Sequence, residues 1–217
     1  MDTQFWLEKW ENREIGFHLD TVHPLLERHW PALAVAEGST VFVPLCGKSL
    51  DLIHLRRLGH RVVGSELSPL AVEQFFAEHG LRPEIAESGG MAVWEAEGIT
   101  LVQGDFFALD RARLPEFGAV YDRASLIALP PERQPDYAER LMALAPAVPI
   151  LLITLEYASD EMRGPPFSTP AERVERLYGR YRIERLEARD ALDENPGLRA
   201  RGLAALTEVA WRLQVRP

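Results

Sequence analysis

Short apolar runs alternate with helical patterns along most of the chain from residue 39 onward. The run at 148–157 is long and nearly continuous, which is typical of a strand buried on both faces. The expected strands are 40–45, 61–66, 99–103, 119–121 and 148–157. The expected helices are 50–58, 69–79 and 132–145, and Ser68-Pro69 are residues typical of a helix start. Strands that alternate with helices predict a doubly wound, mostly parallel sheet in an α/β protein.

Three segments depart from this alternation. Residues 181–188 and 205–215 predict two strands without a clear helix between them, and therefore an antiparallel hairpin at the sheet edge. Residues 81–98 are an insertion rich in Gly and Glu, which we interpret as a small hairpin. Residues 1–37 have a mostly helical pattern with several aromatic residues. We expect one domain over 1–217, with 38–217 as its core.

Composition and charge exclude several classes of protein. The 217 residues include 24 Lys or Arg and 33 Asp or Glu, a net charge of −9. We expect no nucleic acid as the main partner, because binding phosphates requires a basic face. The chain has no run of about 18 apolar residues, so we expect no membrane span, and residues 1–10 lack the apolar region of a signal peptide. The single cysteine, Cys46, allows no intrachain disulfide and favours a cytoplasmic location.

Ligands of a doubly wound sheet bind beyond the carboxyl ends of its strands, so the loops that follow the strands hold the candidate residues. The first loop is Val43-Pro44-Leu45-Cys46-Gly47-Lys48-Ser49, in which Gly47 lets the backbone approach a nucleotide-like ligand. It is no P-loop, because Phe42 stands where that motif requires glycine, and the dinucleotide fingerprint also fails. A plain strand-to-helix turn is the alternative. We interpret Cys46 as a small residue that fills this turn rather than as a nucleophile.

Acidic residues follow the next two expected strands. Glu66 lies about 20 residues after the first loop, where a carboxylate can accept both ribose hydroxyls of an adenosine-type ligand. The alternative is a solvated carboxylate before a helix N-terminus. Asp105 and Phe106 follow the third strand, where they can bind an adenine amino group and cover the base. A phenylalanine pair such as Phe106-Phe107 is equally consistent with the core.

Two further motifs face the same edge of the predicted sheet. Asp122 and Arg123 follow the fourth strand, and Arg123 can bind a carboxylate or another anionic acceptor, although a structural ion pair is the alternative. Gly164-Pro165-Pro166-Phe167 follows the long fifth strand as a stiff apolar loop that suits a flat, apolar acceptor. A rigid connector is the alternative there. The spacing of His18, His23 and His29 does not fit a metal pair, so we expect no metal site.

Several of these segments are similar, in the same order, to segments of the thiopurine S-methyltransferase family. The likeness covers nearly the whole chain, from Phe5 to about Trp211. The matching segments are Phe5-Trp6 with Trp10, Gly16-Phe17-His18, residues 43–49, residues 121–126 and residues 164–167. Several unusual motifs in order are far more specific than any one of them, and the chain length suggests the bacterial branch.

The resemblance implies a class I fold, a Rossmann-like sheet of seven strands that binds S-adenosylmethionine. It places cofactor contacts at Trp10, Leu45, Glu66 and Arg123, with Asp105 and Phe106 near the adenine. It also implies that residues 1–37 fold over the cofactor as a helical lid, which brings Trp10 and Phe17 to the site.

The implied reaction is methyl transfer to the sulfur of aromatic or heterocyclic thiols such as thiopurines. Bacterial members also imply selenium and tellurium compounds as acceptors. We expect Arg123 to stabilise or orient the anionic acceptor and Asp122 to hold Arg123. We name no catalytic base, because aromatic thiols ionise easily.

Two other functions fit parts of the pattern. A nicotinamide-dependent oxidoreductase would also use Glu66 for a ribose, but the glycines that bind its pyrophosphate are missing. A non-catalytic module would bind S-adenosylmethionine without transferring its methyl group. Nothing in the sequence suggests a large exposed apolar patch, so we expect a monomer.

Overall fold

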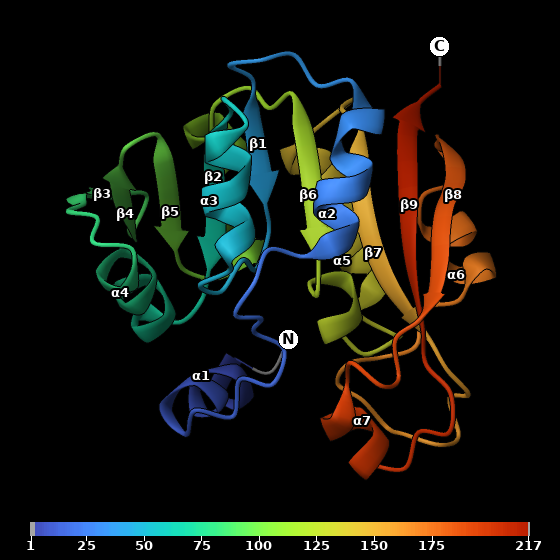
Figure 1. The fold of residues 1–217 in the computed structure, drawn as a ribbon. Coiled ribbons are helices and arrows are strands. Elements are labelled where there is room, and N and C mark those ends of the chain that lie inside the picture. The colour runs from blue at the N-terminus through green and yellow to red at the C-terminus, as the bar shows by residue number, and fades with distance from the viewer. Residues whose placement is uncertain (1–2, 217) are drawn as a thin grey trace.

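A nine-stranded sheet with the order β3-β4-β5-β2-β1-β6-β7-β9-β8 forms the centre of the part of the chain that the structure describes (Figure 1). The structure is a computed structural model that describes residues 3–216, so residues 1, 2 and 217 of the expected domain lie outside the described residues. The parallel strands are β1 (Thr40–Val43), β2 (Arg61–Glu66), β5 (Ile99–Gln103), β6 (Ala119–Arg123) and β7 (Ile150–Glu156). This arrangement confirms the expected α/β class with a mostly parallel sheet.

Antiparallel strands extend the sheet at both edges. The expected edge hairpin is present as β8 (Tyr181–Asp190) and β9 (Thr207–Val215), with β9 antiparallel to β7. The expected hairpin within 81–98 is also present as β3 (Glu84–Ser88) and β4 (Met91–Ala96). It is not separate, however, because β4 pairs with β5 and thereby satisfies backbone groups of an otherwise unpaired edge. The sheet therefore has two more strands than the seven we expected.

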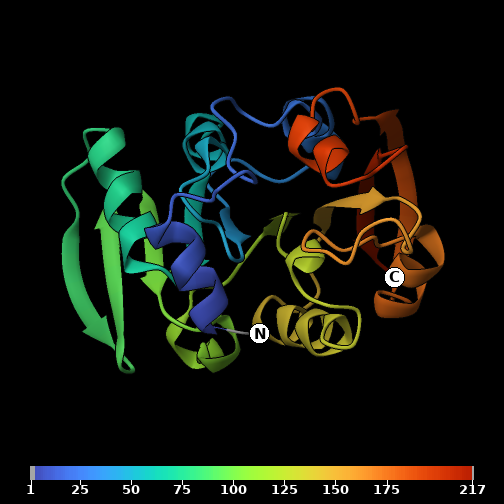
Figure 2. The same cartoon turned by 90° about the horizontal axis from the view of Figure 1, so that it is seen from below.

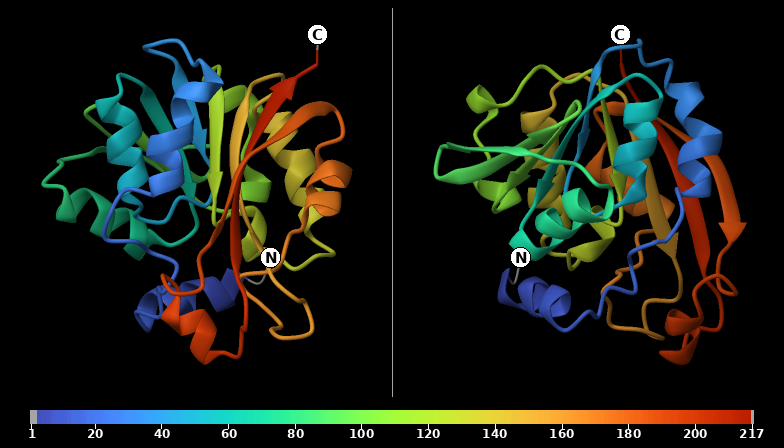
Figure 3. Two further views of the ribbon diagram at one scale, coloured as in Figure 1. Left: turned by 45° about the vertical axis from the view of Figure 1, so that its right-hand side comes forward. Right: turned by 60° about the vertical axis from the view of Figure 1, so that its left-hand side comes forward.

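Helices cover both faces of the sheet (Figures 1 and 3). One face carries α2 (Pro24–His29), α3 (Leu50–Arg57) and α4 (Pro69–Glu78), and the other carries α5 (Gln134–Leu144) and α6 (Ala171–Leu177). Helix α4 begins as predicted, with the Ser68 hydroxyl accepting the Ala71 amide at 3.3 Å. The short 3₁₀ helices are η1 (Trp30–Leu33), η2 (Phe106–Ala108), η3 (Arg111–Arg113) and η4 (Leu126–Ala128). No helix of residues 3–216 is long and apolar enough to cross a membrane.

The sheet separates two apolar cores, and this explains the continuous apolar runs. In β1, Val41 and Val43 pack toward α2, α3 and α4, whereas Phe42 packs toward α5 and α6. In β7, alternate residues of 150–153 divide between the same two cores. Successive strand residues point to opposite faces, so a strand covered on both sides needs apolar residues at every position.

The N-terminal segment covers the carboxyl ends of the parallel strands only in part. Helix α1 (Thr3–Glu11) lies beyond these ends, and α7 (Pro196–Ala200) lies beyond them on the other side (Figures 1 and 2). Residues 12–23 have no regular helix, and Leu25 and Leu26 of α2 are fully buried against the sheet. The expected lid of 1–37 is therefore too long, because residues from α2 onward belong to the core.

Candidate active site

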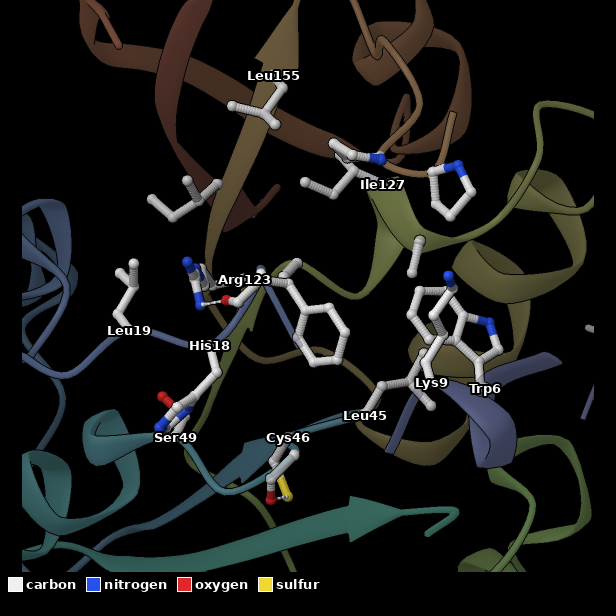
Figure 4. Close-up of a pocket in the computed structure, with 18 of the residues that line it drawn as sticks. Trp6, Lys9, His18, Leu19, Leu45, Cys46, Ser49, Arg123, Ile127 and Leu155 are labelled. Carbon is white, nitrogen blue, oxygen red and sulfur yellow. Dashed lines mark hydrogen bonds between the residues drawn. The ribbon is translucent and has the colours of Figure 1, made fainter. Parts of the chain in front are cut away.

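A cavity of about 670 Å³ lies between α1, the carboxyl ends of the parallel strands and the loop that contains α7. Figure 4 shows Leu45, His18 and Arg123 near its middle, Ile127 and Leu155 on one side, and Cys46 and Ser49 on another. Its volume and mainly apolar lining are typical of a small-molecule site. The structure brings five of the expected site residues to this cavity, namely Trp10, Phe17, Leu45, Glu66 and Arg123.

The first loop is held in a tight turn against β2. Leu45 and Gly47 both have left-handed backbone conformations, with φ of 45° and 55°. The Cys46 amide donates to the Ser65 carbonyl at 2.9 Å, and the Gly47 amide donates to a Glu66 carboxylate oxygen at 2.8 Å. A Cβ atom on Gly47 would lie 3.2 Å from the Trp10 ring. Gly47 thus allows the close approach of α1 that the sequence alone did not reveal.

Cys46 is a buried part of the same turn. Its Sγ atom lies 3.6 Å from the Gly47 carbonyl oxygen. Burial raises the pKa of the thiol, and the negative charge of Glu66 raises it further. A thiol with a raised pKa is a weak nucleophile. The small-residue interpretation of Cys46 agrees with this environment.

Glu66 ends β2 with its carboxylate at the cavity and only 6% of the residue exposed. One oxygen accepts the Gly47 amide and the other accepts the Ser68 amide at 2.7 Å. Burial raises the pKa of Glu66, and these backbone amides partly offset the effect. A carboxylate has about four lone-pair sites, so Glu66 can accept further hydrogen bonds from a ligand.

Aromatic rings form the end of the cavity beside α1. Trp6 and Trp10 each meet the Phe17 ring edge to face, with centroids 5.7 Å apart in both pairs. Trp10 is almost completely buried. The aromatic residues of the polar N-terminal segment therefore gather around one ligand-sized space, which explains their presence there.

Arg123 is the last residue of β6 and reaches into the cavity, where its guanidinium donates to the Phe17 carbonyl oxygen at 2.9 Å. The lining residue Lys9 is paired with Glu14, and Lys48 is paired with Glu78. Within residues 3–216, Arg123 forms no ion pair with a carboxylate, and the same holds for Arg201. These two guanidinium groups can therefore bind an anion without first breaking an ion pair.

Asp122 does not hold Arg123, so this expectation is wrong. Adjacent strand residues point to opposite faces, and Asp122 points into the core beneath α5. Its carboxylate accepts the Tyr137 hydroxyl at 2.8 Å and the Leu126 amide at 3.3 Å. Burial raises its pKa from 3.8 to about 6, although these hydrogen bonds oppose the shift. Asp122 shapes the end of β6 from the side away from the cavity.

Asp105 and Phe106 lie at the carboxyl edge of the sheet but are not among the residues that line the cavity. Phe106 is fully buried, with its ring centroid 5.0 Å from that of Tyr137, so its ring cannot cover a base. The core interpretation is the correct one for that side chain. Asp105 accepts the Phe107 amide at 3.0 Å, and the preceding Gly104 amide donates to the Glu66 carbonyl at 2.8 Å. The turn with Asp105 thus lies beside Glu66.

An apolar wall and a polar loop close the cavity on the side away from α1. Pro165 and Pro166 line this wall as expected, together with Ile127, Leu155 and Leu198. Phe167 is directed elsewhere, because its ring packs against Gly164 and its amide donates to the Ile127 carbonyl.

Several lining residues were given no role by sequence reasoning, and most of them lie outside the motifs that it used. They include His18, Asp51, Tyr121, Glu194, Arg201 and Glu208. His18 was matched as part of Gly16-Phe17-His18 and weighed as a metal ligand, but it was given no role at the site. Burial, and after it the charge of Lys48, lowers the pKa of His18. Within residues 3–216, no group of three or more His, Cys, Asp and Glu residues is arranged to hold a metal ion.

Comparison with known proteins shows the family of the chain. The family model for thiopurine S-methyltransferase matches residues 1–216. A thiopurine S-methyltransferase of Methylococcus capsulatus is 51% identical over 219 aligned residues, which cover 100% of this chain and 99% of that protein. One of Nitrosospira multiformis is 49% identical, with coverage of 100% and 99%.

Solved structures share the fold at low sequence identity. A SAM-dependent methyltransferase from Anabaena variabilis has a TM-score of 0.65 at 14% identity and covers 99% of this chain and 95% of its own. The 1,6-didemethyltoxoflavin-N1-methyltransferase of Burkholderia thailandensis, solved with S-adenosylhomocysteine, has a TM-score of 0.61 at 15% identity, with coverage of 98% and 87%. The full-length family match and the relatives near 50% identity show that the chain belongs to the thiopurine S-methyltransferase family and is a methyltransferase that uses S-adenosylmethionine.

Proposed function

We propose that this methyltransferase acts on the sulfur of aromatic or heterocyclic thiols, with thiopurines as one acceptor class. The observation that carries the proposal is that one cavity combines an apolar wall with two guanidinium groups that have no carboxylate partner. Arg123 and Arg201 form no ion pair with a carboxylate of residues 3–216, and Ile127, Leu155 and Pro166 line the same space. An ionised aromatic thiol is flat, apolar and anionic, and therefore complements both features.

The cofactor fits the end of the cavity between Glu66 and the aromatic rings. We propose that Glu66 accepts the ribose hydroxyls with the lone pairs that its backbone partners leave open. The left-handed turn at Leu45 and Gly47 gives a ligand close access to the backbone. Asp105 is proposed as an adenine contact, because its turn is hydrogen bonded to the end of β2 beside Glu66. When bound, S-adenosylmethionine supplies an electrophilic methyl group on a sulfonium sulfur.

The protein's own contribution is to align, desolvate and balance charge. Trp10 and Phe17 lie at the cofactor end of the cavity, where aromatic faces favour a cationic sulfonium. Arg123 neutralises and orients the anionic acceptor, and its bond to Phe17 links it to the N-terminal segment. Alignment of two reactants in a space that excludes water lowers the barrier of a bimolecular transfer. We assign no general base, since an aromatic thiol loses its proton readily in solution.

Transfer of a labelled methyl group to a panel of acceptors tests the proposal. The panel contains thiophenol, a thiopurine, selenite and tellurite, because we also propose selenium and tellurium anions as acceptors that bind Arg123 and Arg201. We expect label in the thiol products and a loss of transfer in Glu66→Ala. Cofactor binding without transfer to any thiol would contradict the thiol proposal and favour a different acceptor or a non-catalytic binding module.

We further propose that the enzyme is a cytoplasmic monomer. Among residues 3–216, the large apolar side chains that are most exposed are Leu58 just after α3, Ile85 on β3 and Val215 on β9. Scattered apolar residues do not form an interface patch. The free, buried Cys46 suits a reducing compartment. Light scattering should give the mass of a single chain, and a dimer at micromolar concentration would refute the monomer.

A further inference from the structure

A buried polar chain runs behind the cavity and connects the two segments that cover it. Its centre is Glu208 on β9, which is only 7% exposed. One carboxylate oxygen accepts a hydrogen bond from Nε2 of His23 at 3.0 Å. The other lies 2.9 Å from Nε and 2.7 Å from Nη2 of the Arg189 guanidinium. Nothing in the proposed transfer requires these side chains, although Glu208 lines the cavity.

The His23 arm leads to the N-terminal cover of the cavity. The Nδ1 atom of His23 accepts the Leu25 amide at 3.3 Å and so caps the start of α2. Because Nδ1 accepts a hydrogen bond, a ring proton lies on Nε2, which donates to Glu208. The His23 amide donates to buried Asp51 at 2.8 Å. His23 therefore ends the segment 12–23 at a fixed point of the core, a few residues after Phe17 and His18.

The Arg189 arm leads to the loop that closes the opposite side. Arg189 on β8 donates two parallel hydrogen bonds of 2.8 Å to the carboxylate of Glu194. Glu194 begins the stretch 194–198, which lines the cavity and contains the start of α7. This outer link is weaker than the inner one, because the Glu194 side chain is 57% exposed and solvent screens such pairs.

The inner link, between Glu208 and its partners His23 and Arg189, is buried and charged, so its loss is costly. A buried carboxylate is costly unless it is paired and hydrogen bonded, and Glu208 has donors on both oxygens. Burial raises the pKa of Glu208, but the hydrogen bonds from His23 and Arg189 outweigh it and lower the pKa overall. Removing either partner leaves a charge in a buried position and loosens the segment that the partner holds.

We propose that Glu208 is a positioning residue that ties the cover of residues 12–23 to the loop of residues 191–206, and so keeps the cavity closed around its ligands. The fraction of molecules with a correctly placed cover sets the apparent affinity for the cofactor. The proposal does not depend on which acceptor receives the methyl group, because cofactor binding is measured without an acceptor.

Three variants separate the links of this chain. Glu208→Gln removes the charge and leaves a single acceptor for two donors. His23→Asn keeps an oxygen that can cap α2 but is too short to reach Glu208. Glu194→Gln weakens only the exposed outer link. The matched control is Glu184→Gln, which breaks a pair with Arg212 across the same two strands but lies outside the cavity.

Calorimetric binding of S-adenosylhomocysteine is the primary measurement, and thermal unfolding measures stability separately. We expect the Kd to rise about 3- to 10-fold in Glu208→Gln and His23→Asn, less in Glu194→Gln, and not in Glu184→Gln. The Kd of the double variant of His23 and Glu208 should be no more than about twofold above that of Glu208→Gln. Both substitutions break the same contact between His23 and Glu208, so their effects on binding do not add. If Glu208 and His23 contributed only to stability, the folded variants would bind S-adenosylhomocysteine with the Kd of the wild type.

An unchanged Kd in folded His23→Asn would overturn the proposal, even if Glu208→Gln failed to fold. An equal rise in Glu184→Gln would also overturn it, because the effect would then be general to the hairpin. Methylation of thiophenol by the same proteins supplies a second readout, in which KM for the cofactor should rise more than kcat falls. Binding that follows this pattern without any thiol methylation supports Glu208 positioning and refutes only the proposed acceptor.

Discussion

Arg123 is the residue on which acceptor binding depends most in this account. Its guanidinium is held by the Phe17 carbonyl and remains without a carboxylate partner among residues 3–216. We expect Arg123→Ala to lower kcat/KM for an aromatic thiol by about 10- to 100-fold, the usual cost of losing one charge-assisted contact. Arg123→Lys keeps the charge and should stay within about tenfold of wild type. Equal steady-state kinetics in all three proteins would exclude Arg123 from catalysis.

Asp122 gives a prediction about stability rather than turnover. Because burial raises its pKa from 3.8 to about 6, its contribution to stability is complete below the unfolded value and is lost as pH rises through the folded value. The expected loss is about 2 kcal/mol between pH 4 and pH 7. In Asp122→Asn this pH dependence should disappear.

Urea unfolding of the two proteins at several pH values measures the difference. The free energy of unfolding of Asp122→Asn should rise relative to wild type as pH rises from 4 to 7. A constant difference over this range would contradict the shifted pKa of Asp122.

Single residues were predictable from sequence where their position after a strand determines their role. Glu66, Leu45 and Arg123 follow parallel strands and reach the cavity. Asp122 was misjudged and Phe106 was left open between a base contact and the core, because the sequence does not show which way either side chain points. That direction is set by packing against α5 and is not encoded in a local motif.

At the scale of elements, the turn after β1 determines how closely α1 can approach. We expect Gly47→Ala to weaken binding of S-adenosylhomocysteine several-fold, because the new Cβ would press on the Trp10 ring from 3.2 Å. Its left-handed backbone adds a stability cost of about 1 kcal/mol. Gly80→Ala is the control, since its φ is also positive at 65° but no atom lies within 4 Å of the added Cβ.

Calorimetry and thermal unfolding of both glycine variants separate strain from contact. Both should lose similar stability, and only Gly47→Ala should lose affinity. A similar loss of affinity in Gly80→Ala would mean that backbone strain alone, rather than the Trp10 contact, controls the cofactor end of the cavity.

Elements with a strong pattern of apolar residues were predictable from the sequence, and elements with a weak pattern were not. Strand β2 spans the predicted residues, and α4 begins at the predicted cap. Helix α6 was missed because its seven residues are mostly charged and only Val174 is fully buried. Residues 12–23 were expected to be helical, yet contacts with Arg123 and Asp51 at the cavity hold them without a regular helix.

At the scale of the whole molecule, the cavity exists only because distant segments meet. The N-terminal segment, the ends of β1, β2, β6 and β7, and the loop of 191–206 all contribute to its lining. Sequence motifs indicated that a site would lie at this edge. They could not indicate the C-terminal side, because Glu208 meets His23 of the N-terminal segment only through the pairing of β9 with β7.

A ligand that bridges these segments should stabilise the entire fold. At 100 times its Kd, S-adenosylhomocysteine should add about 2.7 kcal/mol to the free energy of unfolding. For a chain of this length that corresponds to a rise in Tm of roughly 5–10 °C. Glu66→Ala at the same ligand concentration should show little rise in differential scanning fluorimetry. An equal rise in both proteins would mean that the ligand binds away from Glu66.

The position of the methyl group in the product tests the central claim most directly. A thiopurine offers one exocyclic sulfur and several ring nitrogens to the same enzyme. With S-adenosylmethionine carrying a ¹³C-labelled methyl group, the account predicts that product NMR places the label on sulfur. Glu66→Ala and Arg123→Ala should form much less of that product. Label on a ring nitrogen, or equal S-methylation by both variants, would contradict the proposed site and its chemistry.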